Sequence, residues 1–296
     1  MASETTSRRD AMSGPTGDRV RILGAALLFS TGGAIIKLTT LSGWQVACYR
    51  SGLAALALYV CVPGWRRGWR LDQFVVGTAY AATMILFVCA NKLTTAANTI
   101  FLQSTAPIYL LFLGPLALRE RIGRGSLIHA GMLAVGLGLF FLGNEAPQVT
   151  APRPLLGNIL GAIAGITWAL AIVGLRRLSV AGSGSTESGS GAAVIVGNGL
   201  AFLFCLPFAA GGPAPSGLDL TIVLYLGFFQ IGLAYVWMTR GLRGVPALEA
   251  SLLLILEPVA SALWAWWIHG ERPGDLALAG CLLILVATVL HTVRKR

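Results

Sequence analysis

The chain has 296 residues, of which 55% are hydrophobic and only 11% are charged, and its mean hydropathy is +0.74. A soluble domain carries roughly 25% charged residues, and a disordered chain lacks apolar side chains, so this composition excludes both classes. The formal net charge of +10 would suggest nucleic acid as a partner only for a soluble protein. The composition therefore predicts an integral membrane protein that binds no nucleic acid.

Ten apolar runs follow one another along the chain, and each is close to the roughly 20 residues that a helix needs to cross a bilayer. They predict an all-α protein with ten transmembrane helices and polar tails at residues 1–21 and 294–296. The Gly/Ser-rich stretch 181–191 is predicted to be a flexible loop. The predicted spans are 22–40, 44–62, 73–91, 96–118, 126–142, 155–175, 191–210, 218–238, 247–268 and 275–293.

The distribution of Lys and Arg predicts the orientation of these spans. If the N-terminus is cytoplasmic, the loops and tails on the inner side hold 17 Lys and Arg residues and those on the outer side hold 3. Cytoplasmic loops of membrane proteins are enriched in these residues. We therefore expect a multi-pass protein of the bacterial inner membrane, monomeric, with both termini in the cytoplasm.

A short pattern in the fourth span recurs 151 residues later around the ninth span. In each copy the glutamate follows the proline by 13 residues. The offset predicts two five-helix repeats, 22–142 and 155–293, joined by an outer loop at 143–154. An odd number of spans per repeat places the second copy upside down, an arrangement found in transporters. The recurring residues are Ala96, Pro107, Glu120 and Arg121 in the first copy and Ala247, Pro258, Glu271 and Arg272 in the second.

Two long segments carry a resemblance to a known family. The segment Gly244–Pro273 (GVPALEASLLLILEPVASALWAWWIHGERP) resembles a family signature. This is the ninth-span signature of the ten-helix EamA-type branch of the drug/metabolite transporter superfamily. The fourth-span signature of the same branch is similar to Thr94–Ile122 (TTAANTIFLQSTAPIYLLFLGPLALRERI). The resemblance implies ten helices, inverted five-helix repeats and export of small metabolites. Within the branch, the chain looks most like the YddG-type aromatic amino acid exporters.

Glu257 is the most informative candidate site residue. It lies about ten residues into the ninth span, so a rise of about 1.5 Å per residue places it near the midplane. A carboxylate at that depth usually faces a cavity or a partner. It could bind a substrate ammonium group or take up a proton, or it could be held by hydrogen bonds and shape the helix. Pro107 and Pro258 predict kinks, which either line the substrate path or have a purely structural role.

Other polar and aromatic residues are weaker candidates for substrate binding. Lys37 and Arg50 could attract a substrate carboxylate, or they could reach the outer headgroups or pair with Glu271 or Asp275. Gln103 could face a cavity or join helices by hydrogen bonds. Rings near mid-membrane could stack on an aromatic or apolar substrate, although core packing explains them as well. The residues of this last group are Tyr80 and Trp168, with Gln230 and Trp237 as further candidates for the same wall.

The sequence predicts a transporter that exports a small-molecule substrate, most readily an aromatic or other neutral amino acid, through a midplane cavity by alternating access. Efflux of lipophilic cations and exchange of phosphorylated sugars or nucleotide sugars stay open as alternatives. An enzyme would need a nucleophile with a base or a metal cluster, and His129, His269 and His291 are scattered. We therefore expect no catalytic residue, no metal and no cofactor.

Overall fold

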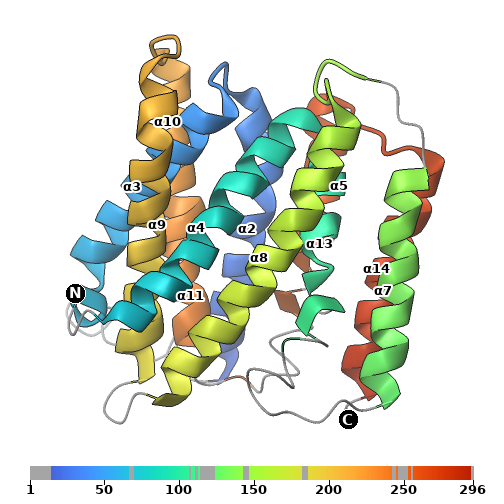
Figure 1. Cartoon of the computed structure of the whole chain (residues 1–296), viewed down its shortest axis with the longest axis horizontal. Helices are drawn as coiled ribbons and strands as arrows, with labels where there is room; N and C mark the ends of the chain where they lie inside the picture. Colours follow the sequence, from blue (N-terminus) through green and yellow to red (C-terminus); the bar gives the residue numbers. More distant parts are fainter. Residues whose placement is uncertain are drawn as a thin grey trace, which may run out of the picture.

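The structure is a computed structural model of the whole chain, drawn as a ribbon in Figure 1. It describes residues 15–66, 70–106, 108–110, 113, 124–142, 147–181, 186–241, 245, 253–254 and 256–294. These residues form helices throughout, and the one β-type contact is an isolated bridge between Gln148 and Ala151. The described part of the chain is therefore all-helical, as its sequence predicts.

Each of the ten predicted spans overlaps a helix or a run of helical segments. Five of the spans are long and apolar enough to cross a membrane as described: Thr16–Lys37, Leu71–Leu93, Pro154–Leu175, Gly189–Ala210 and Gly217–Met238. The segments before residue 143 are α2 (Pro15–Leu38), α3 (Gly43–Cys61), η1 (Pro63–Arg66), α4 (Leu71–Leu93), α5 (Ala96–Gln103) and α7 (Arg124–Leu142). Those after it are α8 (Pro154–Ala181), α9 (Thr186–Ala210), α10 (Gly217–Leu224), η2 (Tyr225–Leu233), α11 (Ala234–Gly241), α13 (Leu256–His269) and α14 (Asp275–Arg294).

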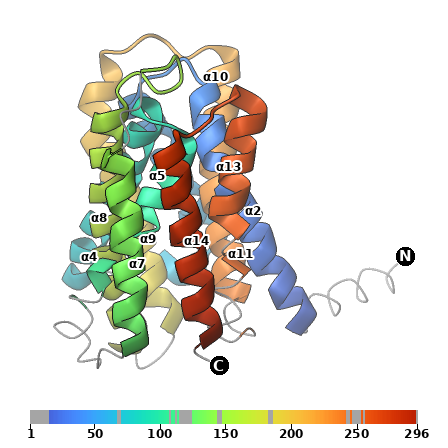
Figure 2. The ribbon, with the colours of Figure 1, turned by 90° about the vertical axis from the view of Figure 1, so that its right-hand side faces the viewer.

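Three helices begin with a side-chain cap at the same end of the bundle, the upper end in Figure 1. Ser42 accepts from the Gln45 amide at α3, Thr95 from the Asn98 amide at α5, and Ser216 from the Asp219 amide at α10. Such caps satisfy amide groups that the first helical turn leaves unpaired. We call this the capped end. The start of α2 and the end of α14 lie at the opposite end (Figure 2).

The main helix contacts join the two halves of the chain to each other. The helices before residue 143 pack chiefly on those after it, in the pairs α4–α8, α4–α9, α3–α9, α2–α11, α2–α13 and α7–α14. The contacts of the two halves match. When each span of a contacting pair is replaced by its counterpart five spans away, the result is again a contacting pair. For example, α4–α8 becomes the pair of α2 with η2 and α11, α5–α8 becomes α13–α2, and α7–α14 is unchanged. The halves therefore interlock around one core.

Glycines on one face of α8 allow it to approach α4 and α5 closely. A Cβ atom added to Gly157 would lie 2.6 Å from the Thr94 amide nitrogen, and one added to Gly165 would lie 2.9 Å from the Leu102 carbonyl oxygen. Gly161 packs on Leu102 in the same seam. Small residues at this spacing are typical of tightly packed helices in membranes.

The substitution Gly157→Leu is expected to prevent most of the protein molecules from folding. The added side chain meets the backbone of Thr94, which cannot move aside without displacing α5, and overpacking costs about 1–3 kcal/mol or more. The monodisperse fraction after solubilisation in detergent measures the effect. Gly131→Leu is the matched control, because a Cβ at that exposed glycine meets nothing within 4 Å. Equal yields of the two variants would contradict the assignment of the seam.

Two segments differ from the predicted elements. The eighth span, predicted as one helix over 218–238, consists of α10, the π-helix η2 and α11. The predicted flexible loop 181–191 is wrong over its second part, because α9 begins at Thr186. Gly191 lies inside that helix against the ring of Trp65, where an added Cβ would lie 2.2 Å from a ring carbon. The sequence suggests that this glycine belongs to a flexible loop, but in the structure it allows α9 to pack closely on Trp65.

Candidate substrate cavity

A cavity of about 350 Å³ lies inside the bundle, and its walls come from α2, α3, α4, α5, α8, η2, α11 and α13. Both halves of the chain therefore contribute to it. Its volume falls within the range of small-molecule sites. Five residues that the sequence singles out line this one cavity: Arg50, Gln103, Trp168, Gln230 and Glu257.

Arg50 brings a positive charge to the cavity from the middle of α3. The residue is 2% exposed, and its Nη2 atom lies 3.4 Å from the sulfur of Met84. Its Nη1 atom is buried without a hydrogen-bond partner. A buried guanidinium without an anion is costly, because the charge loses its hydration and gains little in return. The geometry of Arg50 therefore favours a negatively charged group of a ligand in the cavity.

Glu257 brings a carboxylate to the cavity from the first turn of α13. The ion pairs between described residues are Arg21–Asp18, Lys37–Glu271 and Arg70–Asp72, so none of them engages Glu257 or Arg50. The two opposite charges thus face one cavity without neutralising each other. The Glu257 carboxylate is therefore available to a ligand in the cavity.

Gln230 lies on the π-helix η2 and adds an acceptor to the same wall. Its Nε2 atom donates to the Phe29 carbonyl at 3.4 Å, and its Oε1 atom is buried without a partner. Gly32 makes room for it, because an added Cβ there would lie 2.6 Å from Nε2. The wide turn of a π-helix places residues i and i+5 on one side. Gln230 and Tyr235 therefore both line the cavity.

Tyr80 lies in the layer behind this wall and is not among the residues that line the cavity. It is completely buried, with its ring centroid 5.8 Å from that of Tyr235 and its hydroxyl 3.4 Å from the Asn198 amide nitrogen. Tyr235 takes the position that the sequence assigns to Tyr80. Trp237 packs on Gly24 of α2, where an added Cβ would lie 2.6 Å from its ring.

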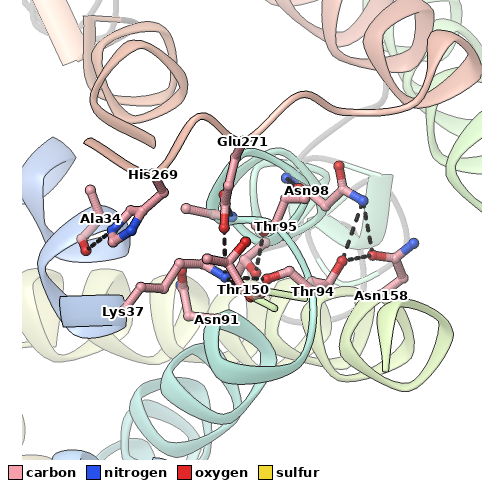
Figure 3. A network of polar contacts seen from close by, with 12 residues as sticks. Ala34, Lys37, Asn91, Thr94, Thr95, Asn98, Thr150, Asn158, His269 and Glu271 are labelled. Atoms are coloured by element: carbon pink, nitrogen blue, oxygen red, sulfur yellow. Dashed lines mark hydrogen bonds and ion pairs between the residues drawn. The ribbon is translucent and has the colours of Figure 1, made fainter. Parts of the chain in front are cut away.

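Lys37 lies at the capped end and forms an ion pair with Glu271. The Lys37 Nζ and Glu271 Oε1 atoms are 2.9 Å apart, and the two side chains are 3% and 1% exposed (Figure 3). Lys37 also donates to the Thr94 carbonyl at 2.7 Å and to the Thr150 carbonyl. Glu271 accepts from the Ala96 amide at 2.9 Å. The pairing with Glu271, one of the alternatives that the sequence leaves open, is confirmed.

Further polar contacts tie helices together at the capped end. The ring of His269 lies 2.8 Å from the Ala34 carbonyl, and Thr94 donates to Asn158 at 2.8 Å (Figure 3). On another side Asp219 accepts from both the amide and the hydroxyl of Thr40, at 2.9 and 2.8 Å. These contacts link α2, α4, α8, α10 and α13 at the capped end.

The two predicted kinks differ in what the structure describes. Pro107 lies outside the described residues, and α5 ends at Gln103, four residues before it. Pro258 lies in α13, and residues 253–254 before it are helical as well. The segments 246–252 and 255 before it lie outside the described residues, so the kink of the ninth span stays a prediction. No group of three His, Cys, Asp or Glu residues suited to a metal occurs among the described residues.

The two halves of this helical membrane protein interlock around a cavity that is lined by one positive and one negative side chain. This architecture is typical of carriers of small molecules. The chain belongs to the EamA-like transporter family, which matches residues 20–142 and again residues 155–293. The family and the relatives below are transporters and not enzymes. The drug/metabolite transporter resemblance is thereby confirmed at the level of the family.

Similar proteins are known from several bacteria. An uncharacterized transporter of Clostridium kluyveri is 20% identical over 74% of this chain and 66% of its own length, so the chain spans just under two thirds of that protein. The uncharacterized transporter YetK of Bacillus subtilis is 27% identical over 83% of this chain and 76% of its own. The pseudopaline exporter CntI of Pseudomonas aeruginosa is 23% identical over 92% and 94%. A crystal structure with 17% identity and a TM-score of 0.63 covers 96% of this chain and 99% of its own and shares the fold.

Proposed function

We propose that the protein exports neutral amino acids with aromatic or other apolar side chains through the central cavity. It works by alternating access in the bacterial inner membrane, as a monomer with both termini in the cytoplasm. The two segments matched by the family and the exchange of helix contacts between counterpart spans support two five-helix repeats. An odd number of spans per repeat inverts the second one, so the repeats supply the two gates.

The observation that carries the proposal is the pair of opposite charges on one cavity. A neutral amino acid presents a carboxylate and an ammonium group on the same carbon. Arg50 offers an unpartnered guanidinium nitrogen to the carboxylate, and Glu257 offers its carboxylate to the ammonium group. Charge-assisted hydrogen bonds of this kind are about twice as strong as neutral ones. The zwitterion neutralises the buried Arg50 and the half-buried Glu257 at once.

The remaining walls suit an apolar side chain. Phe29, Phe87, Trp168 and Tyr235 line the cavity together with aliphatic residues. An aromatic side chain of a substrate would be stabilised here by burial of its apolar surface and by stacking on these rings. The relative in Pseudomonas aeruginosa is named as an exporter, which supports the outward direction of transport.

The same charges argue against the two alternative cargoes. A phosphorylated sugar or nucleotide sugar is held best by several cationic side chains, and in the described part of the cavity wall Arg50 is the one cation. A lipophilic cation would pair with Glu257 but would meet Arg50 in the same low-dielectric space. Like charges at close range are strongly repulsive there.

Counterflow in proteoliposomes tests the proposal, with labelled phenylalanine, tryptophan, threonine and tetraphenylphosphonium compared side by side. We expect accumulation of the amino acids, phenylalanine and tryptophan above threonine, and none of the cation. Empty liposomes and protein-containing liposomes without internal substrate are the controls. Accumulation of the cation alone would overturn the substrate class. Accumulation of none of the four compounds would also overturn it, and phosphorylated metabolites would be tested next.

A further inference from the structure

A second cavity of about 330 Å³ adjoins the first at Glu257. The two cavities share five lining residues, Ser104, Trp168, Ile172, Leu254 and Glu257. The second one extends away from Arg50 toward α14, and we call it the side chamber. A group bound between Arg50 and Glu257 would therefore lie at its entrance.

Among the described residues that line the side chamber, Glu257 is the one charged residue and most of the others are apolar. Phe101, Leu110, Pro258 and Leu285 are among its lining residues. The Ser104 hydroxyl donates to the Ile100 carbonyl at 2.7 Å. The Thr288 hydroxyl donates to the Ile284 carbonyl at 2.8 Å. Since both hydroxyls donate to backbone carbonyls of preceding residues, the described wall of the chamber offers a ligand one charge at its entrance and mainly apolar surface beyond it.

Helix α14 forms the far wall of the side chamber. It packs mainly on α7, and this pair of helices stands at the right-hand edge of the bundle in Figure 1 and in front of it in Figure 2. Ile284 is wedged against Gly136 of α7, where an added Cβ would lie 2.8 Å from its Cγ1 atom. Leu285 is half-buried and lines the chamber. The size of the residue at position 285 therefore sets how far a bound group can extend.

We propose that the side chamber is the subsite for the side chain of the substrate, and that it selects for large apolar side chains. This inference rests on the proposed function. The α-carbon of the substrate lies between Arg50 and Glu257, and its side chain passes Trp168 into the chamber. A lipid acyl chain is the other candidate occupant. It would bury the Glu257 carboxylate against hydrocarbon with no cation to balance it, which is unfavourable.

The test compares Leu285→Trp with the wild type in counterflow of phenylalanine and alanine. The larger side chain fills the chamber, so we expect the phenylalanine-to-alanine ratio to fall at least about tenfold while alanine counterflow stays within about twofold. Leu282→Trp is the matched control, because Leu282 lies on the same helix and is 56% exposed. Leu285→Ala enlarges the chamber, and it is expected to raise counterflow of naphthylalanine relative to phenylalanine. This second variant keeps the proposal testable if Leu285→Trp does not fold.

The outcomes distinguish failure of the side-chamber proposal from failure of the proposed substrate class. Equal loss of phenylalanine and alanine counterflow in Leu285→Trp, or no change in their ratio, overturns the subsite. An unchanged ratio with loss of co-purified phospholipid would assign the chamber to an acyl chain instead, and would also overturn it. If the wild type carries no amino acid, binding of hexylamine and of methylamine is measured by thermal shift. Loss of hexylamine binding alone in Leu285→Trp would support the subsite for another amine, and unchanged hexylamine binding would overturn it.

Discussion

Arg50→Met is expected to lower counterflow of phenylalanine at low concentration by about 30-fold or more, because removing one partner of a buried charge pair costs about 2–5 kcal/mol. The variant keeps a long apolar side chain in the wall beside Met84 and removes the charge that the substrate carboxylate meets. The apparent KM and the maximal counterflow rate, measured in proteoliposomes of equal protein content, give the size of the loss.

Matched substrates separate binding from folding in this experiment. Phenylethylamine lacks the carboxylate and phenylpropionate lacks the ammonium group. Arg50→Met should lower counterflow of phenylalanine far more than that of phenylethylamine, and Glu257→Gln should show the mirror pattern with phenylpropionate. Arg50→Lys keeps the charge but loses the planar fork, so a partial loss is expected. If Arg50→Met lowers all three substrates equally, Arg50 has a structural role and the zwitterion model fails.

Lys37→Met is expected to destabilise the protein by about 3–5 kcal/mol, because it leaves the Glu271 carboxylate buried without a charge partner. It also frees the Thr94 and Thr150 carbonyls, so the capped end loses three contacts at once. Thermal unfolding of the purified protein, followed by tryptophan fluorescence, measures the fall in Tm. The double variant Lys37→Met with Glu271→Gln should recover part of the loss, since neither position of this buried pair then carries a charge.

Arg70→Met provides the control for this second result. Arg70 pairs with Asp72 at 2.8 Å, but their side chains are 62% and 41% exposed. An exposed ion pair contributes at most about 1 kcal/mol, so its loss should leave Tm nearly unchanged. A Tm of Lys37→Met equal to that of Arg70→Met would contradict a stabilising role for the pair at the capped end.

The sequence predicts the helices of this protein well, and the structure shows why. In a bilayer every backbone group must be satisfied within its own helix, so each apolar run of sufficient length has one stable conformation. The depth of a polar residue along its run then indicates which residues can meet. Gln230 and Glu257 come from separate spans, yet each lies near the middle of its span, and both line one cavity. Arg50 lies in the outer half of its predicted span, and the fold brings it to the same cavity.

Other features depend on packing that spacing does not encode. Lys37 is shallow in its helix, and only the fold brings Glu271 from the other half of the chain to it. Tyr80 lies deeper in its predicted span than Tyr235 does, yet the packing of the two rings leaves Tyr235 at the cavity and Tyr80 behind it. The π-helix between residues 225 and 233 contributes to this choice, because an ordinary helical period does not place Gln230 and Tyr235 on one face. The side chamber depends on how α14 sits against α5 and α13.

That π-helix also has a consequence for how the cavity can change among relatives. A π turn holds more residues than an α turn, so loss of a single residue within 225–233 would restore the α-helical period. The wide turn already takes up the extra residue, so the later side chains of the span, Tyr235 and Met238 included, would stay close to their present directions. A one-residue gap at this point of an alignment would therefore mark a local change of the cavity wall near Gln230 on an unchanged fold.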